Sequence, residues 1–309
     1  MTQLQNIAIA GASGNIGRVV VQKLLASGFN VTALQRLSST ATFPAGVKTR
    51  KFAYDSFESW KSALEGEDVV ISFLIPPATE YQNMAADAAV AAKVKHFIPS
   101  EWGMNTTILG DTIFGKLLSD KTATQAHLAK LSKDNNLFSW TGISTGLWFD
   151  WGLENLSLGF DKTTRTSEIA DSGSEKFQTT SLGFIADVVT SILRDPGQAA
   201  DKYITIASFN ISQKGILALA EEISGERWSL KPYKVDEVQR TAEKALDDGD
   251  FDAAFFPLLH GRLLRDGADL ALKPGQNFAT DVLGLAEEDP AVAVRAWLRK
   301  KDDPCGGLE

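Results

Sequence analysis

The chain has 309 residues, of which 44% are hydrophobic and 23% charged, and its formal net charge is −8. This is the profile of a soluble globular protein. The acidic charge gives no support to nucleic-acid binding, and no apolar run approaches the roughly 18 residues of a membrane span. The sequence has one cysteine, Cys305, and its three histidines, His96, His127 and His260, lie far apart. We therefore expect a cytoplasmic protein without disulfides and without a metal site.

Short apolar runs alternate with amphipathic stretches in the first half of the chain, which predicts a parallel sheet covered by helices. The predicted strands are Asn6–Ala10, Asn30–Leu34, Thr49–Phe52, Val69–Phe73, His96–Ile98 and Phe138–Ile143. The predicted helices are Asn15–Ser27, Ser56–Leu64, Glu80–Ala92 and Thr112–Asp134. The first apolar run leads directly into a glycine-rich turn, so we expect a first strand there and not a signal peptide.

The pattern becomes less regular after about residue 150. Here the sequence predicts one strand, Tyr203–Ile206, and the helices Ser181–Leu193, Ser212–Ser224, Val235–Leu246, Phe251–Leu264 and Ala291–Arg299. We expect an α/β domain over residues 1–153, with a doubly wound parallel sheet of the Rossmann type. Residues 154–309 are expected to form mainly a smaller subdomain, with some elements that return to the main sheet.

A glycine motif, G-x-x-G-x-x-G, follows the first predicted strand and opens the first predicted helix, at Gly11–Gly17. Glycine allows a tight turn and a close approach to a pyrophosphate, and the N-terminus of the helix attracts phosphate. A glycine-rich turn without a ligand is the alternative. This position in the chain favours a dinucleotide site, for which we select Gly11, Ser13, Gly14, Asn15, Ile16 and Gly17.

The end of the second predicted strand indicates which dinucleotide binds. An NAD site usually carries an acidic residue there, whereas this chain has Arg36, followed by Ser38. A guanidinium group can bind a 2′-phosphate through two parallel hydrogen bonds. Residues 1–54 also contain six bases and none of the 39 acids of the chain. An exposed surface arginine and a chance charge distribution are the alternatives, but the pattern favours NADPH, which makes residues 1–153 the NADP-binding domain.

The catalytic pair of typical short-chain dehydrogenases, a tyrosine with a lysine four residues later, is absent from the sequence. Lys121 is the best replacement, because helical spacing places it among Phe114, Leu117, Thr124 and Leu128 on the apolar face. An inward-facing lysine tends to have a lowered pKa, which suits proton transfer near neutral pH. A lysine that extends to solvent or forms a salt bridge is the equally weighted alternative.

Two further segments lie where strands are predicted to end, the position where ligands bind in this architecture. Pro99–Gly103 includes Ser100 and Trp102, and Thr145–Trp151 includes the other aromatic cluster. We expect Ser100 to contact the cofactor. The substrate residues that we select are Trp102, Gly146, Trp148 and Phe149, on the argument that aromatic rings stack on a flat substrate. Core packing is the alternative for each of these rings.

These motifs together resemble the NmrA-like and isoflavone reductase-like branch of atypical short-chain dehydrogenases, and residues 140–153 resemble fungal members in particular. The resemblance implies an NADP-binding Rossmann domain, a C-terminal substrate-binding subdomain and a role in secondary metabolism. It also implies that Lys121 contacts the cofactor and assists proton transfer. Arg36 and Ser38 would hold the 2′-phosphate. The residues implied to line the cofactor are Phe73, Leu74 and Pro76. Trp102, where plant reductases commonly have phenylalanine, argues against a plant-like substrate.

Three functions remain open at this stage. The first is a reductase that passes hydride from NADPH to a small carbonyl, imine or enone, with Lys121 assisting the proton. The second is a regulator without catalysis that senses the redox state of NADP(H) together with a protein partner. The third is an isomerase or cyclase that retains its cofactor. We expect a small-molecule substrate, no membrane and no nucleic-acid partner, and a monomer or homodimer.

Overall fold

The structure, a computed structural model, describes residues 4–75 and 78–300. The chain forms two compact units. The first contains residues 1–145, 182–206 and 278–285, and the second contains residues 146–181, 207–277 and 286–309. The first segment of the first unit therefore ends at residue 145, before the boundary predicted at residue 153. Two later segments, residues 182–206 and 278–285, also belong to the first unit. The substrate-binding role of the second unit stays a prediction.

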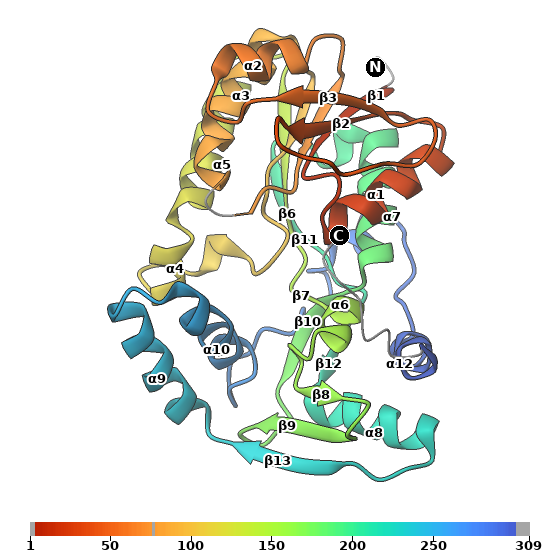
Figure 1. The fold of residues 1–309 in the computed structure, drawn as a ribbon, viewed down its shortest axis with the longest axis vertical. Coiled ribbons are helices and arrows are strands. Elements are labelled where there is room, and N and C mark those ends of the chain that lie inside the picture. Colours follow the sequence, from red (N-terminus) through yellow and green to blue (C-terminus); the bar gives the residue numbers. More distant parts are fainter. Residues whose placement is uncertain (1–3, 76–77, 301–309) are drawn as a thin grey trace. The chain divides into compact units, whose positions relative to one another are not determined.

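A seven-stranded sheet forms the centre of the first unit, in the order β11-β6-β5-β4-β1-β2-β3 (Figure 1). All its neighbouring strands are parallel. The strands are β1 (Asn6–Ala10), β2 (Asn30–Arg36), β3 (Lys48–Phe52), β4 (Val69–Ser72), β5 (His96–Ile98), β6 (Ser139–Ser144) and β11 (Lys202–Thr205). The strand order reverses between β1 and β4, which is the crevice where ligands bind in open α/β sheets. The predicted Rossmann-type fold is confirmed.

Helices cover both faces of this sheet (Figure 1). On one face α1 packs against α7, and on the other α2 packs against α3, which in turn contacts α5. Their bounds are α1 (Asn15–Ala26), α2 (Phe57–Ala63), α3 (Gln82–Ala91), α5 (Ser119–Asp134) and α7 (Leu182–Arg194). The helix α7 and the strand β11 follow a long excursion of the chain through the second unit. The short α11 (Phe278–Asp281) also contacts β11.

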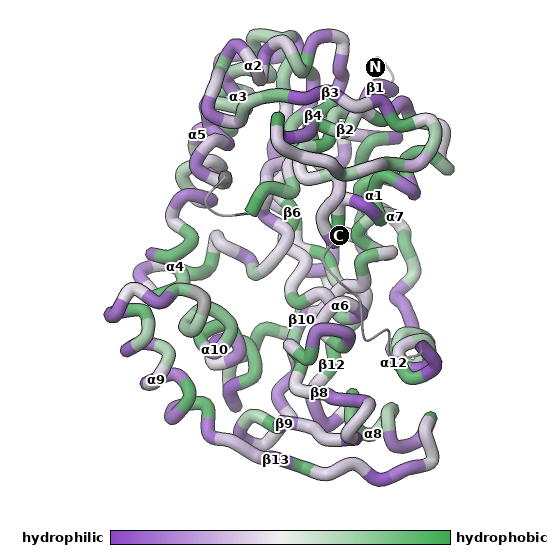
Figure 2. The backbone as a smooth tube through the Cα atoms, in the orientation of Figure 1, coloured by the Kyte–Doolittle hydropathy of each residue, from purple (hydrophilic) through white to green (hydrophobic). Residues whose placement is uncertain are grey.

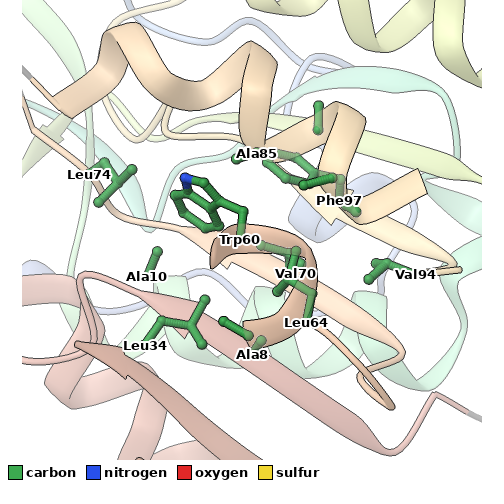
Figure 3. Close-up of a cluster of buried hydrophobic side chains, with 14 of the residues drawn as sticks. Ala8, Ala10, Leu34, Trp60, Leu64, Val70, Leu74, Ala85, Val94 and Phe97 are labelled. Carbon is green, nitrogen blue, oxygen red and sulfur yellow. The ribbon is translucent and has the colours of Figure 1, made fainter. Parts of the chain in front are cut away.

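Large side chains fill the space between the sheet and the helices α2 and α3 (Figure 3). The indole of Trp60 is fully buried, and its Nε1 donates a hydrogen bond to the Tyr54 carbonyl at 2.8 Å. Small residues such as Ala8 and Ala85 leave room for this ring. Truncation of a buried tryptophan costs roughly 3–5 kcal/mol, so this cluster fixes α2 on the sheet. Leu74, a residue implied to line the cofactor, belongs to the same cluster.

One predicted helix, Thr112–Asp134, is wrong as a continuous element. The chain forms α4 (Ile113–Leu117) and then α5, with the break at Leu118 (φ −107°, ψ 18°). Ser119 and Asp120 open α5, and such residues favour helix N-termini because their side chains compete for backbone groups. The single helical face on which Lys121 was aligned with Phe114 and Leu117 therefore does not exist. Only the part of that face that lies within α5 is present, and there Thr124 and Leu128 are buried.

The 3-10 turns η1 (Ala78–Tyr81), η2 (Thr106–Ile108) and η3 (Pro196–Gln198) complete the first unit. The predicted helix Glu80–Ala92 is therefore split into η1 and α3.

The second unit contains two three-stranded sheets, in the orders β12-β10-β7 and β13-β9-β8. Its strands are β7 (Leu147–Trp148), β8 (Phe160–Asp161), β9 (Thr166–Ala170), β10 (Lys176–Thr180), β12 (Phe209–Ser212) and β13 (Ser229–Tyr233). The sequence reasoning missed all six, because they are short and several lack a clear alternation of apolar residues. Its helices are α6 (Phe149–Glu154), α8 (Gln213–Ser224), α9 (Val235–Asp247), α10 (Phe251–Leu263) and α12 (Pro290–Arg299). Hydrophobic and hydrophilic residues alternate along α9 (Figure 2). The four helices that the sequence predicts in this unit, α8, α9, α10 and α12, are confirmed within a few residues.

Candidate functional site

The loop Gly11–Gly17 connects β1 to α1 and is shaped by its glycines. Gly11 has φ +80°, and a Cβ there would lie 2.7 Å from the carbonyl oxygen of Phe73. A Cβ on Gly17 would collide with the carbonyl oxygen of Gly11. Gly14 donates a backbone hydrogen bond to the same carbonyl at 3.0 Å. The loop is thus a tight turn in which the first and third glycines have no substitute.

The N-terminus of α1 has the properties of an anion site. Gly14 is its N-cap, and within the described chain no side chain caps it and no acidic residue lies in its first turn. The N–H groups of such a turn and the helix dipole both favour a bound phosphate. Ser13 is exposed and Asn15 half-buried beside this turn, while Ile16 is buried in the core. The loop therefore fits the pyrophosphate of a dinucleotide, although Ile16 could contribute only its backbone.

Arg36 ends β2 and is exposed, as is Ser38 in the loop that follows. Burial raises the pKa of Tyr54, and the positive charge of Arg36 opposes part of this shift. The sequence reasoning did not select Lys51, which pairs with Gln35 across β2 and β3. Its Nζ donates to the carbonyls of Leu37 at 3.2 Å and of Ser39 at 3.1 Å. Lys51 thereby holds the main chain on both sides of Ser38.

The segments after β4 and β5 are bound to each other. Ser100 is buried, its backbone N–H donates to Gln82 Oε1 at 2.6 Å, and its Oγ donates to the carbonyl of Leu74 at 2.7 Å. The Phe73 ring lies 4.7 Å from the Trp102 ring, at an interplanar angle of 39°. The hydroxyl proton of Ser100 and the side chain of Leu74 are thus both engaged inside the protein. Pro76 lies outside the described residues.

Trp102 adopts a strained backbone conformation with φ +32°, which is rare for a residue other than glycine. Its indole Nε1 donates to the carbonyl of Ser72 at 2.7 Å, and the whole side chain is buried. Gly103 is the residue after Trp102, and its carbonyl accepts hydrogen bonds from Thr145 N–H and from Ser144 Oγ, both at 3.0 Å. Strain of this kind persists only where the surroundings fix the backbone, and such positions cluster at functional sites.

Lys121 reaches this segment from the first turn of α5. Its Nζ donates to the carbonyl oxygen of Glu101 at 2.6 Å, and the side chain as a whole is half-buried. Burial of the ammonium group lowers the pKa of Lys121, and the negative charge of Glu101 opposes part of this shift. Lys121 thus faces inward, although the helix that carries it begins later than expected, and its catalytic role stays a prediction. Glu101 itself is buried, and the sequence reasoning did not select it.

In the second unit, the three predicted substrate residues have different surroundings. Gly146 has φ +61°, and a Cβ there would collide with the carbonyl of Gln178. Phe149 is fully buried, and its ring packs against Phe209 at 4.9 Å, so no face of the ring is exposed. Trp148 is half-buried.

Trp148 belongs to a row of rings, in which Trp151 lies 5.5 Å from it and Phe256, on α10, lies 6.5 Å from Trp151. Phe256 is 41% exposed. The sequence reasoning missed Phe256 because its neighbours in this row are more than a hundred residues earlier in the chain.

Among the described residues, no helix is long and apolar enough to cross a membrane. The same part of the chain holds no group of three or more His, Cys, Asp or Glu side chains that could bind a metal ion.

The parallel sheet and the glycine loop at its switch point define a Rossmann-type α/β protein. The model of the NmrA-like family matches residues 3–241, and the chain belongs to this family. The oxidoreductase PoxI of Penicillium oxalicum is 30% identical over 223 residues, which cover 72% of this chain and 71% of PoxI.

Two solved structures share the fold. The structure of AtPrR2 with NADP⁺ and (+)-pinoresinol superposes with a TM-score of 0.77 at 16% identity, and the match covers 96% of this chain and 100% of AtPrR2. An isoflavone reductase superposes with a TM-score of 0.74 at 18% identity, with coverages of 96% and 99%. The predicted family is thus confirmed, and the relative's name agrees with the predicted class of enzyme, an oxidoreductase.

Proposed function

We propose that this protein is an NADPH-dependent reductase that transfers hydride to a small aromatic or conjugated carbonyl, imine or enone. The observation that carries the proposal is Lys121, an ammonium group with a lowered pKa that lies on the segment following β5. The loop Gly11–Gly17 follows β1 in the same parallel sheet, so both stand at its carboxyl edge. The name of the relative PoxI and the NADP⁺ of the AtPrR2 structure support it.

The residues of the first unit fit NADPH. The open N-terminus of α1 would bind the pyrophosphate, through the predicted set Gly11, Ser13, Gly14, Asn15, Ile16 and Gly17. Arg36 and Ser38 would bind the 2′-phosphate, in a loop that Lys51 holds. We retain Phe73, Leu74, Pro76 and Ser100 as the lining of the cofactor site.

The reduction needs a hydride and a proton. NADPH, when bound, supplies the hydride from its nicotinamide ring. Lys121 holds the proton on Nζ and donates it to the oxygen or nitrogen of the substrate as the negative charge develops there. The Glu101 carbonyl orients the ammonium before transfer. A lysine with a lowered pKa gives up this proton more readily than an exposed lysine does.

Aromatic side chains support the choice of a flat substrate. Trp148, Trp151 and Phe256 form a row of rings in the second unit, and Phe256 offers an exposed face. Rings of this kind bind planar apolar ligands by stacking and by removal of apolar area from water. We assign substrate contact to Trp148 and its two neighbours, and we retain Trp102 and Gly146 as predicted contacts. Phe149 is the weakest of the predicted four, because its ring is enclosed.

A regulator that senses the redox state of NADP(H) is a second candidate. The observation that favours it is that Lys121 binds a main-chain carbonyl, a bond that a purely structural lysine also makes. An isomerase or cyclase that retains NADPH would use the same groups without net oxidation.

Calorimetric titration of the purified protein with NADPH, NADP⁺ and NADH separates these candidates, because it requires no substrate. The reductase predicts tight NADPH, weaker NADP⁺ and very weak NADH. Preference for NADP⁺ would favour the regulator. Equal affinities for NADH and NADPH would contradict the role of Arg36. Consumption of NADPH with a panel of conjugated carbonyls then separates a reductase from an isomerase, since an isomerase leaves NADPH unchanged.

A further inference from the structure

Glu101 is a buried carboxylate without a cationic side chain bound to it in the described parts of the chain. Its side chain is 1% exposed. Three neutral donors hold it: Gln125 Nε2 at 3.1 Å from Oε1, and Thr106 Oγ1 at 3.0 Å and Tyr203 Oη at 3.2 Å from Oε2. A buried carboxylate is costly unless it is hydrogen-bonded in this way, so its retention calls for a reason other than packing.

The three donors come from distant parts of the first unit and are linked to one another. Thr106 belongs to η2, Gln125 to α5 and Tyr203 to β11. Gln125 Nε2 also donates to Thr106 Oγ1 at 2.7 Å, and Thr106 N–H donates to Tyr203 Oη at 3.2 Å. Burial and the nearby charge of Glu101 raise the pKa of Tyr203, which keeps its phenol protonated and able to donate. The network therefore presents donors to both carboxylate oxygens, which suits a group that only accepts.

Lys121 and Gln125 are one turn apart on the same face of α5 and bind the same residue. Gln125 binds the carboxylate of Glu101, whereas Lys121 binds its carbonyl oxygen. Glu101 is thus fixed at both its side chain and its main chain by a single helix. The strained Trp102 follows directly, so the peptide that Lys121 binds has little freedom to move.

We infer that Glu101 is a positioning residue for Lys121: its carboxylate fixes the peptide that orients the ammonium group, and its negative charge favours the charged form of that group. This inference rests on the proposed function insofar as Lys121 donates a proton to substrate. The electrostatic coupling between Glu101 and Lys121 does not depend on it. A negative charge near an ammonium group favours its charged form.

Other titratable groups lie on the elements packed against α5. They are Asp87 on α3, Glu80 and Tyr81 on η1, and Lys116 on α4. Asp87 pairs with His127 at 2.7 Å, on a later turn of α5. Tyr203 faces the Glu101 carboxylate. The charge that acts on the Lys121 ammonium is that of Glu101.

The test compares three variants that differ in the charge at this network. Glu101→Gln removes the charge, whereas Tyr203→Phe removes one neutral donor and leaves the charge in place. Glu101→Asp keeps the charge but shortens the side chain. The readout is the titration of Lys121, followed by NMR of lysine labelled with ¹³C at Cε in the full-length protein, with the signal assigned by its loss in Lys121→Arg.

We expect the Lys121 titration to move to lower pH by about one unit or more in Glu101→Gln. It should stay close to that of the unchanged protein in Tyr203→Phe and Glu101→Asp. An unchanged titration in Glu101→Gln would overturn the inference. If Glu101→Gln does not fold, a shift of a full unit in either charge-retaining variant would overturn it, because the titration would then follow packing and not charge.

The same variants distinguish this inference from the proposed function. If Lys121→Ala retains full turnover of NADPH with a conjugated carbonyl such as cinnamaldehyde, the catalytic role of Lys121 fails. The shift in Glu101→Gln would then still demonstrate the coupling. If both hold, the basic limb of the kcat profile should move to lower pH in Glu101→Gln together with the NMR titration.

Discussion

Two segments at the carboxyl edge of the main sheet are held in place by opposite means. The loop Gly11–Gly17 is shaped by its own backbone, because the first and third glycines fill positions where a Cβ would meet a carbonyl. The segment Pro99–Gly103 is held by side chains and backbone groups from elsewhere, some of them about a hundred residues away. The first is thus determined locally and the second by partners brought to it by the fold.

This difference predicts different responses to substitution. A tight turn with no free space fails as a whole when one atom is added. A segment held by many separate hydrogen bonds loses a part of its stability with each bond. The loop should therefore respond to substitution sharply and the segment gradually.

Gly17→Val should have the largest effect. The new side chain would collide with the Gly11 carbonyl and the backbone of Ala12, so the turn that we propose for phosphate binding cannot form. We expect NADPH affinity to fall by more than about 100-fold and stability by roughly 1–3 kcal/mol. Calorimetry and urea denaturation measure the two effects. The matched control is Gly14→Ala, whose Cβ would meet only the Gly11 carbonyl, at 3.3 Å, and should cost under about 1 kcal/mol. Equal losses of stability in both variants would contradict the steric explanation.

Lys121→Ala should lower kcat by about 100-fold or more, the usual contribution of a general acid, and leave the NADPH affinity within a few-fold. NADPH consumption with the carbonyl panel measures it. Lys116→Ala, on the exposed side of the short helix before it, is the control.

The pH dependence of the reduction follows from the same lysine. Only protonated Lys121 can donate, and burial lowers its pKa from the usual 10.5 of lysine. Activity should therefore be full at low pH and fall as pH rises through this lowered pKa, well before an exposed lysine would titrate. A profile that is flat up to the usual range of lysine would show that Lys121 is not the donor.

The sequence predicted most of the first unit and the tight turn at Gly11–Gly17, because both depend on local patterns. Strands that are buried on both faces appear as short apolar runs, and Gly11–Gly17 is a contiguous motif. Lys121 was selected on a helical face that proved half wrong, since the break at Leu118 is decided by the two polar residues after it. Its inward orientation nevertheless agrees with the prediction, because Thr124 and Leu128 are buried within the same helix as the lysine.

The missing part of the site could not be predicted for a physical reason. Glu101 and Tyr203 are 102 positions apart, and only the parallel pairing of β11 with β6 brings the phenol to the carboxylate. Lys51 could not be singled out for the same reason, because it is one of several bases on an edge strand. Its role follows only from its hydrogen bonds to the loop after β2. No spacing in the sequence marks either contact.

Arg36→Ala tests the recognition of the 2′-phosphate. Loss of charge-assisted hydrogen bonds worth about 1.5–3 kcal/mol should weaken NADPH binding by roughly 10- to 100-fold and leave NADH binding unchanged. Arg50→Ala is the control within the same acid-free region, because Arg50 donates to the carbonyls of Ala63 and Glu65 instead. If Arg50→Ala reduced the preference for NADPH equally, the preference would arise from the summed charge of the region and not from Arg36.

Ser100→Ala should have the smallest effect on NADPH affinity and bears most directly on the comparison. It removes the 2.7 Å hydrogen bond from Ser100 Oγ to the Leu74 carbonyl and leaves that buried acceptor unpaired, at a cost of about 1–3 kcal/mol. The backbone bond to Gln82 and the anchors of Trp102 and Gly103 remain, so NADPH affinity should change by less than about three-fold. Ser38→Ala, at an exposed position, should change stability by less than about 0.5 kcal/mol. Urea denaturation and calorimetry give both quantities. A collapse of NADPH binding in Ser100→Ala would show that the segment responds as a single unit, as the glycine loop does, and the contrast between local and distributed support would no longer hold.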